Sequence, residues 1–167
     1  MKTVSYYSPQ QLAQLTANRK KEFKSLLIRL KKMKPGKLDE LVHSLHEQAF
    51  STFNCLDCAN CCASISPIII DSDIRRIARK QRLKPARFIE QYLLLDEDDD
   101  YVFRESPCPF LFTDNKCGIY EDHPRACREY PHTDRKRFRQ ILNLSLKNCE
   151  ICPVVYAIFS YLSEQNK

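Results

Sequence analysis

The stretch that decides how this chain folds is Cys55-Leu56-Asp57-Cys58-Ala59-Asn60-Cys61-Cys62. Cys55 and Cys58 are separated by two residues, and metal-binding knuckles typically use two to four. A second pair with the same spacing, Cys149 and Cys152, lies near the C-terminus. Two such pairs in one chain are a strong signal of metal binding. We therefore predict a fold organised around cysteine-bound metal.

The chain contains nine cysteines, and their bunching is typical of ligands rather than of scattered core residues. Nine thiolates suffice for two four-coordinate centres with one cysteine left over, so we expect more than one metal ion per chain. Adjacent side chains point apart in most backbone conformations, so Cys61 and Cys62 need not serve the same metal atom. The candidate metal ligands are Cys55, Cys58, Cys61, Cys62, Cys108, Cys117, Cys127, Cys149 and Cys152.

The spacing leaves the metal open between an iron–sulfur cluster and Zn²⁺. Cys55, Cys58 and Cys61 reproduce the first three ligands of a ferredoxin run, and the Cys-Pro pairs at 108–109 and 152–153 match its remote ligand. The cysteine that follows without a spacer departs from that pattern. Zinc knuckles often use glycine, and this chain has only two. The balance favours an iron–sulfur cluster slightly.

Length and composition predict an ordinary soluble domain. The chain has 167 residues, 43% of them hydrophobic and 29% charged, which suits one small globular unit. The N-terminal residues show no apolar segment of a secretory signal, and no apolar run is long enough to span a bilayer. We expect a cytoplasmic protein, in which disulfides do not persist, and an odd number of cysteines agrees with that.

The expected fold class is α+β and mostly helical, a small single domain with a short β-hairpin. Residues 1–53 form an N-terminal helical segment, in which apolar spacing predicts an amphipathic helix over 10–33. Residues 54–153 form the cysteine-cluster metal-binding region. Residues 154–167 form an apolar C-terminal packing helix. All three segments are expected to belong to one domain.

Two short strands are expected within the cysteine-cluster region. Tyr101–Phe103 and Phe110–Phe112 are rich in aromatic and apolar residues, and residues 113–116 form a turn. This arrangement would bring Cys108 and Cys117 to the two arms of a hairpin.

The N-terminal amphipathic helix is strongly basic. Residues 19–37 contain nine lysines or arginines and one acid, Glu22. Such a face can follow a nucleic-acid backbone or an anionic membrane surface, or it can simply be the solvated side of a helix packed on the core. The second interpretation is the simpler one.

The cysteine run and three later segments resemble the YkgJ-like cysteine-cluster proteins of bacteria, the CxxCxxCC family. These segments are Cys108-Pro109-Phe110-Leu111, Cys117-Gly118-Ile119-Tyr120-Glu121 and Pro124-Arg125-Ala126-Cys127-Arg128-Glu129-Tyr130-Pro131. The family is described as zinc- or iron-chelating, and its members are often labelled iron–sulfur proteins. The resemblance covers about half the chain and implies metal chelation by these cysteines.

One residue departs from the family pattern. His123 stands where the family usually has arginine, and a histidine can bind metal where an arginine cannot. A surface histidine in a proline-flanked turn is the simpler interpretation, and the same holds for His132.

Metal binding is the function we predict, with metal ions and a protein as partners. A metal- or cluster-dependent enzyme for redox chemistry or methyl transfer is an alternative, because the flagellin lysine methylases share a similar cysteine run. The chain shows no phosphate-binding glycine motif and no Ser/His/Asp constellation, which weighs against catalysis, and no catalytic residue is assigned. A nucleic-acid or membrane-surface adaptor using the basic helix is a further alternative.

Overall fold

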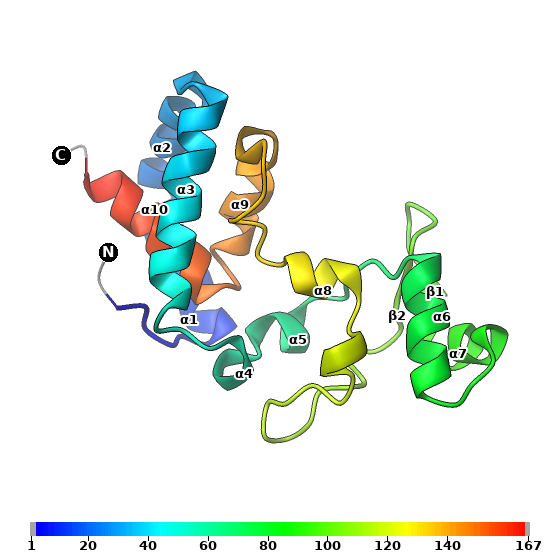
Figure 1. The fold of residues 1–167 in the computed structure, drawn as a ribbon. Coiled ribbons are helices and arrows are strands. Elements are labelled where there is room, and N and C mark those ends of the chain that lie inside the picture. Colours follow the sequence, from blue (N-terminus) through cyan, green and yellow to red (C-terminus); the bar gives the residue numbers. More distant parts are fainter. Residues whose placement is uncertain (1–2, 166–167) are drawn as a thin grey trace. The chain divides into compact units, whose positions relative to one another are not determined.

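The computed structural model describes residues 3–165 and is mostly helical, with one two-stranded antiparallel sheet among these residues (Figure 1). This confirms the α+β, mostly helical prediction. The chain forms two compact units. The first unit ends at Asn60 and resumes at Pro131, and the second unit spans Cys61–Tyr130. The expected grouping of segments 1–53, 54–153 and 154–167 into a single domain stays a prediction.

Within the described residues, the regular elements of the first unit are all helices. Its helices are α1 (Pro9–Asn18), α2 (Lys20–Lys32), α3 (Pro35–Phe50), α4 (Cys55–Cys58), the 3-10 helix η2 (Phe138–Ile141), α9 (Leu142–Asn148) and α10 (Pro153–Glu164). The single helix expected over 10–33 is therefore two helices. Ser8 starts α1 with a capping box, and the backbone leaves helical geometry at Arg19, where φ is −104° and ψ is 12°.

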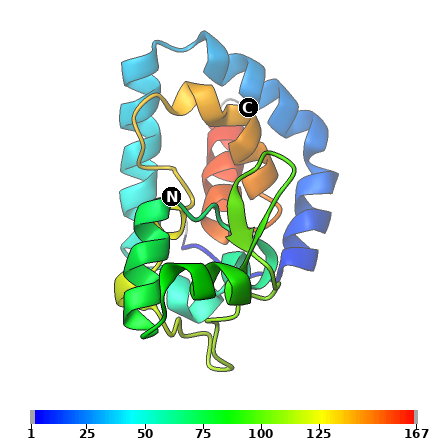
Figure 2. The same ribbon diagram turned by 90° about the vertical axis from the view of Figure 1, so that its right-hand side faces the viewer.

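Helix α10 lies among the other helices of the first unit and contacts α1, α2, α3 and α9 (Figure 2). Its apolar residues are buried on nearly every side, as expected of a helix with so little polar surface. The Phe159 ring packs edge-on against Phe23 of α2, with 5.7 Å between centroids. Within residues 3–165 no single helix is long and apolar enough to cross a membrane, and Phe138–Asn148 with Pro153–Glu164 would qualify only together, across a 111° bend.

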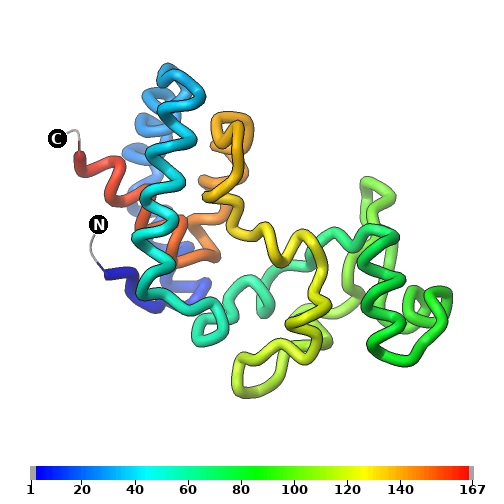
Figure 3. The backbone as a smooth tube through the Cα atoms, in the orientation of Figure 1, coloured from blue at the N-terminus to red at the C-terminus, as the bar shows by residue number. Residues whose placement is uncertain are grey.

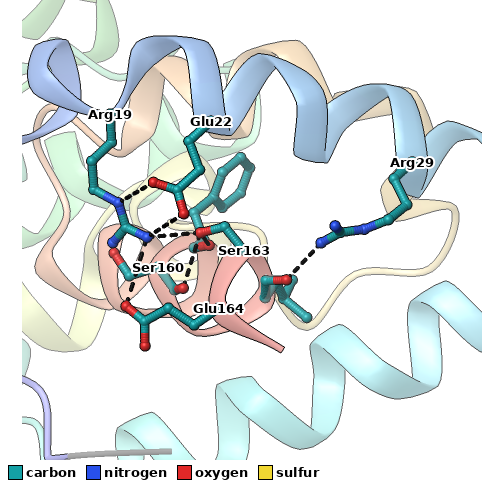
Figure 4. A network of polar contacts seen from close by, with 8 residues as sticks. Arg19, Glu22, Arg29, Ser160, Ser163 and Glu164 are labelled. Atoms are coloured by element: carbon teal, nitrogen blue, oxygen red, sulfur yellow. Dashed lines mark hydrogen bonds and ion pairs between the residues drawn. The ribbon is translucent and has the colours of Figure 1, made fainter. Parts of the chain in front are cut away.

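Two arginines of the basic segment hold the C-terminal end of α10 (Figure 4). Arg19 pairs with Glu22 at 2.9 Å and donates to the Ser163 hydroxyl at 2.9 Å. Arg29 donates to the Leu162 carbonyl at 2.7 Å, one of the last carbonyls of the helix. Cations favour this end of a helix, because its carbonyl groups carry partial negative charge. Part of the basic character of residues 19–37 therefore serves packing.

The second unit combines short helices with the hairpin (Figure 3). Its elements are α5 (Asn60–Ser64), which begins at the last residue of the first unit, α6 (Asp71–Lys80), α7 (Pro85–Tyr92), β1 (Leu93–Leu95), β2 (Tyr101–Phe103), the 3-10 helix η1 (Tyr120–Asp122) and α8 (Arg125–Glu129). The strands pair Leu93 with Phe103 and Leu95 with Tyr101. The core beneath them contains Ile77, Phe88 and Phe110.

One of the two expected strands is present. Tyr101–Phe103 is a strand and pairs with Leu93–Leu95, whereas Phe110–Phe112 is not a strand. The latter segment turns back at once, because the Phe112 N–H donates to the Lys116 carbonyl at 2.8 Å, and only an isolated bridge joins Leu111 to Cys117. Phe110 points into the core, where its ring lies 5.1 Å from that of Tyr92. The tight turn still places Cys108 and Cys117 on its two arms, as predicted.

A buried carboxylate connects α6 to the start of α8. Asp73, 1% exposed, accepts from the Arg76 guanidinium at 2.6 Å and from the Arg125 backbone N–H at 3.1 Å. Arg76 also donates to the His123 carbonyl at 2.9 Å. Because Cys127 follows Arg125 by two residues, Asp73 fixes the part of the chain that carries this cysteine.

Replacing Asp73 by alanine is expected to lower the free energy of unfolding by about 1–3 kcal/mol, because it leaves a guanidinium and a backbone N–H unpaired in a buried place. Asp73→Asn keeps one acceptor oxygen and should lose less. Urea denaturation followed by circular dichroism measures both. The control is Asp71→Ala, an exposed acid in the first turn of the same helix. Equal losses for Asp71→Ala and Asp73→Ala would contradict the role given to Asp73.

Candidate metal centres

The two compact units divide the nine cysteines between them. The first unit contains the first cysteine set: Cys55, Cys58, Cys149 and Cys152. The second unit contains the second cysteine set: Cys61, Cys62, Cys108, Cys117 and Cys127. No disulfide joins any cysteines of the described chain. The boundary between the units lies between Asn60 and Cys61, inside the run that opened the sequence analysis.

The first pair of the first cysteine set lies on one short helical turn. Helix α4 begins at Cys55 and ends at Cys58, and the Asn54 side chain accepts from the Leu56 N–H at 3.1 Å to cap its start. Ala59 then takes a left-handed conformation with φ 51°, and its N–H donates to the Cys55 carbonyl at 3.0 Å. Both ends of the turn that carries the two thiols are thus held by hydrogen bonds.

The second pair of this set lies where α9 passes into α10. The Cys152 N–H donates to the Asn148 carbonyl at 2.8 Å, and Cys152 precedes the first residue of α10. The Cys149 thiol is fully buried and donates to the Ser145 carbonyl at 3.4 Å. Burial raises the pKa of Cys152 to about 12, although the N–H groups of Val155 and Val154 act in the opposite direction.

Asn60 joins the two pairs of the first cysteine set. Its side-chain amide donates to the Ile151 carbonyl at 3.0 Å and to the Tyr7 carbonyl at 2.7 Å. Ile151 lies between Cys149 and Cys152, whereas Asn60 follows Cys58 by two residues. The charges of the Cys55 and Cys58 thiolates add to burial in raising the pKa of Cys152, as expected for sulfur atoms that lie near one another.

The sulfur atoms of Cys61 and Cys62, in the second cysteine set, lie 4.0 Å apart. Sulfur atoms that share a tetrahedral Zn²⁺ lie about 3.8 Å apart, given Zn–S bonds of about 2.3 Å. The two thiols therefore point toward the same region, although adjacent side chains usually diverge. The hydrogen bond from Cys61 lowers the pKa of Cys62 to about 7.

Backbone contacts connect Cys62 to the other segments of the second cysteine set. The Cys108 N–H donates to the Cys62 carbonyl at 2.8 Å, and the Cys117 segment pairs with the Cys108 segment through the Gly118 N–H, which donates to the Phe110 carbonyl at 2.8 Å. Burial raises the pKa of Cys108 to about 11 and that of Cys127 to about 12, with further contributions from the charge of Cys62. Burial likewise raises the pKa of Cys117.

The donor chemistry of both sets suits a thiophilic metal. Thiolate sulfur selects zinc and iron–sulfur clusters, whereas hard cations prefer oxygen. Buried thiols resist ionisation, and a bound cation supplies the charge that stabilises the thiolate. Within residues 3–165, however, no three His, Cys, Asp or Glu side chains converge closely enough to hold a metal ion. Each set therefore suits a metal because its donors are thiols and because its members belong to one compact unit. The described side chains do not form a closed coordination site.

Two of the histidines, His123 and His46, have local hydrogen-bond partners. The His123 ring hydrogen-bonds to the Tyr120 carbonyl through Nδ1 and stacks on the Tyr120 ring, with 5.1 Å between centroids. His46 of α3 hydrogen-bonds to the Thr133 hydroxyl at 2.7 Å. His132 adopts φ 65°, a conformation that histidine visits more readily than most residues. A metal-binding role for His123 or His132 stays a prediction.

Sequence reasoning missed the two residues that hold the cysteine segments in place. Asn60 lies inside the cysteine run, and its position between two cysteines was the available signal. Asp73 lies in the first turn of α6, where an acid is usually a favourable charge near the N-terminus, so its long-range contact with Arg125 had no signal in the sequence.

Comparison with known proteins gives one finding. Residues 54–153 match the model of the CxxCxxCC family, described as "Putative zinc- or iron-chelating domain". Neither the curated proteins nor the solved structures gave a match. The matched residues include all nine cysteines and cover more than half of the chain. The chain therefore belongs to the CxxCxxCC family of zinc- or iron-chelating domains.

Proposed function

We propose that this protein holds an iron–sulfur cluster or zinc through its clustered cysteine thiolates, with more than one metal ion per chain. The observation that carries this is the gathering of four cysteines in one compact unit and five in the other. Each unit thus has enough thiolates for a closed four-coordinate centre. Family membership supports metal chelation in general.

Structural stabilisation is the role that the surroundings of the thiols favour. The first cysteine set draws on segments more than ninety residues apart, and its C-terminal pair is buried beside α10. Metal-binding free energy becomes folding free energy when the site does not exist in the unfolded chain. We therefore place the metal in the role of a cross-link between these segments, with the chain acting by holding metal or by binding a protein partner, and we propose a cytoplasmic location.

The basic face of α2 supports an adaptor role less directly. Arg19 and Arg29 are engaged with α10, so the exposed cations of this helix are lysines: Lys20, Lys21, Lys24, Lys31 and Lys32. Lysines bind phosphate as point charges without the bidentate geometry of arginine. A nucleic-acid or membrane-surface role stays a prediction.

Purified anaerobically, the protein is expected to contain about two or more zinc or iron atoms per chain by elemental analysis. An iron–sulfur cluster adds visible absorption that is lost on exposure to oxidant, whereas zinc gives none. The control is the same protein unfolded and stripped of metal before analysis. A metal content as low as that of the control, even after anaerobic addition of zinc or of iron, would contradict the proposal.

Removing the metal is expected to lower the melting temperature by about 10 °C or more, because structural metal contributes several kcal/mol to folding. Differential scanning calorimetry in the presence and absence of a chelator measures the change. Restoring the metal should restore the melting temperature. An unchanged melting curve in a sample shown by elemental analysis to be metal-free would show that the metal has no structural role.

A further inference from the structure

We propose that the run Cys55–Cys62 is divided between two metal centres at the bond between Asn60 and Cys61. The first cysteine set forms one four-thiolate centre, in which the two Cys-x2-Cys pairs face each other. Four members of the second cysteine set form the other: Cys62, Cys108, Cys117 and Cys127. This assignment rests on the proposed metal-binding function and adds to it which thiolates share a metal.

The chain path separates the two halves of the run. In a ferredoxin-type run Cys55, Cys58 and Cys61 would serve one cluster. Here α4 ends at Cys58, the left-handed Ala59 redirects the backbone, and α5 begins at Asn60 as a separate helix. Cys61 and Cys62 belong to the second unit, as do Cys108, Cys117 and Cys127. The halves are thus continuous in sequence and belong to different packing units.

Asn60 selects the C-terminal pair as the partner of Cys55 and Cys58. An amide NH₂ group has two protons, and both are used, one on the Tyr7 carbonyl and the other on the Ile151 carbonyl. Asn60 is 8% exposed, so these bonds are largely shielded from water. The Thr16 hydroxyl further donates to the Cys149 carbonyl at 3.2 Å. The turn between Cys149 and Cys152 is therefore anchored beside the residues that follow Cys58.

The second centre uses Cys62 rather than Cys61. The Cys62 carbonyl accepts the Cys108 N–H, so these residues are joined directly. The Gly118 N–H, which donates to the Phe110 carbonyl at 2.8 Å, brings the Cys117 segment to the Cys108 segment, and Asp73 holds the start of α8, which carries Cys127. The Cys61 sulfur lies 4.0 Å from the Cys62 sulfur, within hydrogen-bond reach of it. A hydrogen bond to a metal-bound sulfur tunes and orients the ligand.

Paired substitutions test the assignment through metal content. Zn²⁺ is added to the reduced protein, and the zinc-to-protein ratio is measured by elemental analysis. Cys55→Ser with Cys58→Ser should remove one of two zinc ions, and so should Cys149→Ser with Cys152→Ser. All four substitutions together should remove no more than either pair. Loss of both zinc ions in the fourfold variant, with one lost in each pair, would overturn the assignment.

Matched variants test the second centre. Cys108→Ser with Cys127→Ser should remove one zinc ion, and adding Cys55→Ser with Cys58→Ser should remove the other. Cys62→Ser should weaken zinc binding at the second centre, whereas Cys61→Ser should keep the ratio of the unchanged protein. A zinc loss that is the same for Cys61→Ser and for Cys62→Ser would contradict the choice between them.

A measurement on the unchanged protein covers variants that fail to fold. The zinc-loaded protein is titrated with a chelator while exposed thiols are alkylated, and the modified positions are found by peptide mass spectrometry. Cys55, Cys58, Cys149 and Cys152 should become modified together. The other four ligands should become modified in a separate step, and Cys61 at a rate independent of the chelator. Joint exposure of Cys55, Cys58, Cys61 and Cys62, apart from the C-terminal pair, would overturn the assignment.

The two proposals fail in different ways. If the unchanged protein binds neither zinc nor iron, the proposed function fails and the assignment fails with it. If it binds metal but the zinc losses show that Cys55, Cys58, Cys61 and Cys62 act as one site, only the division at Asn60 is wrong.

Discussion

A thiolate is stabilised by water or by a nearby cation, and in this protein Cys149 and Cys152 are buried, six other thiols are half-buried and only Cys55 is exposed. Burial, with a smaller contribution from the charges of neighbouring thiolates, raises the pKa of Cys127 and of Cys152 to about 12. A chain that keeps such groups in apolar surroundings must leave them protonated or supply a positive charge. A thiophilic metal supplies that charge and at the same time joins segments that are distant in sequence. The two metal centres that we propose would meet this requirement in both cysteine sets.

The organisation of the first unit follows from the same requirement. Its N-terminal helices surround α10, the most apolar helix of the chain, and the cysteine pair that leads into α10 lies next to the pair that follows α3. Hydrophobic packing places α10 in the unit, and the hydrogen bonds of Asn60 fix where its N-terminal end lies. Burial of apolar side chains, such as Phe159 of α10 against Phe23, is not directional. The Asn60 amide, which donates to two carbonyl groups, specifies one arrangement.

Sequence patterns predicted the elements whose cause is local. The apolar C-terminal segment is a helix, α10, as expected. The break at Arg19 escaped prediction because residues on both sides of it have helical spacing. Leu93–Leu95 was not predicted as a strand because its pairing with β2 depends on the acidic turn between them, residues 96–100, and not on its own residues. The nine candidate ligands were identified from spacing, but spacing gives no information on which unit each cysteine joins.

The second unit is continuous in sequence, whereas the first is interrupted by it. Synthesis from the N-terminus therefore completes the second unit once Tyr130 has been added, while the first still lacks η2, α9 and α10. During that interval the apolar faces of α2 and α3 have no α10 to cover them, and Cys55 and Cys58 have no C-terminal pair beside them. Loop-closure entropy grows only slowly with length, so the seventy residues between Asn60 and Pro131 add little to the final stability cost. Their effect falls on the order of assembly: the unit that begins first in the chain is the last to be completed.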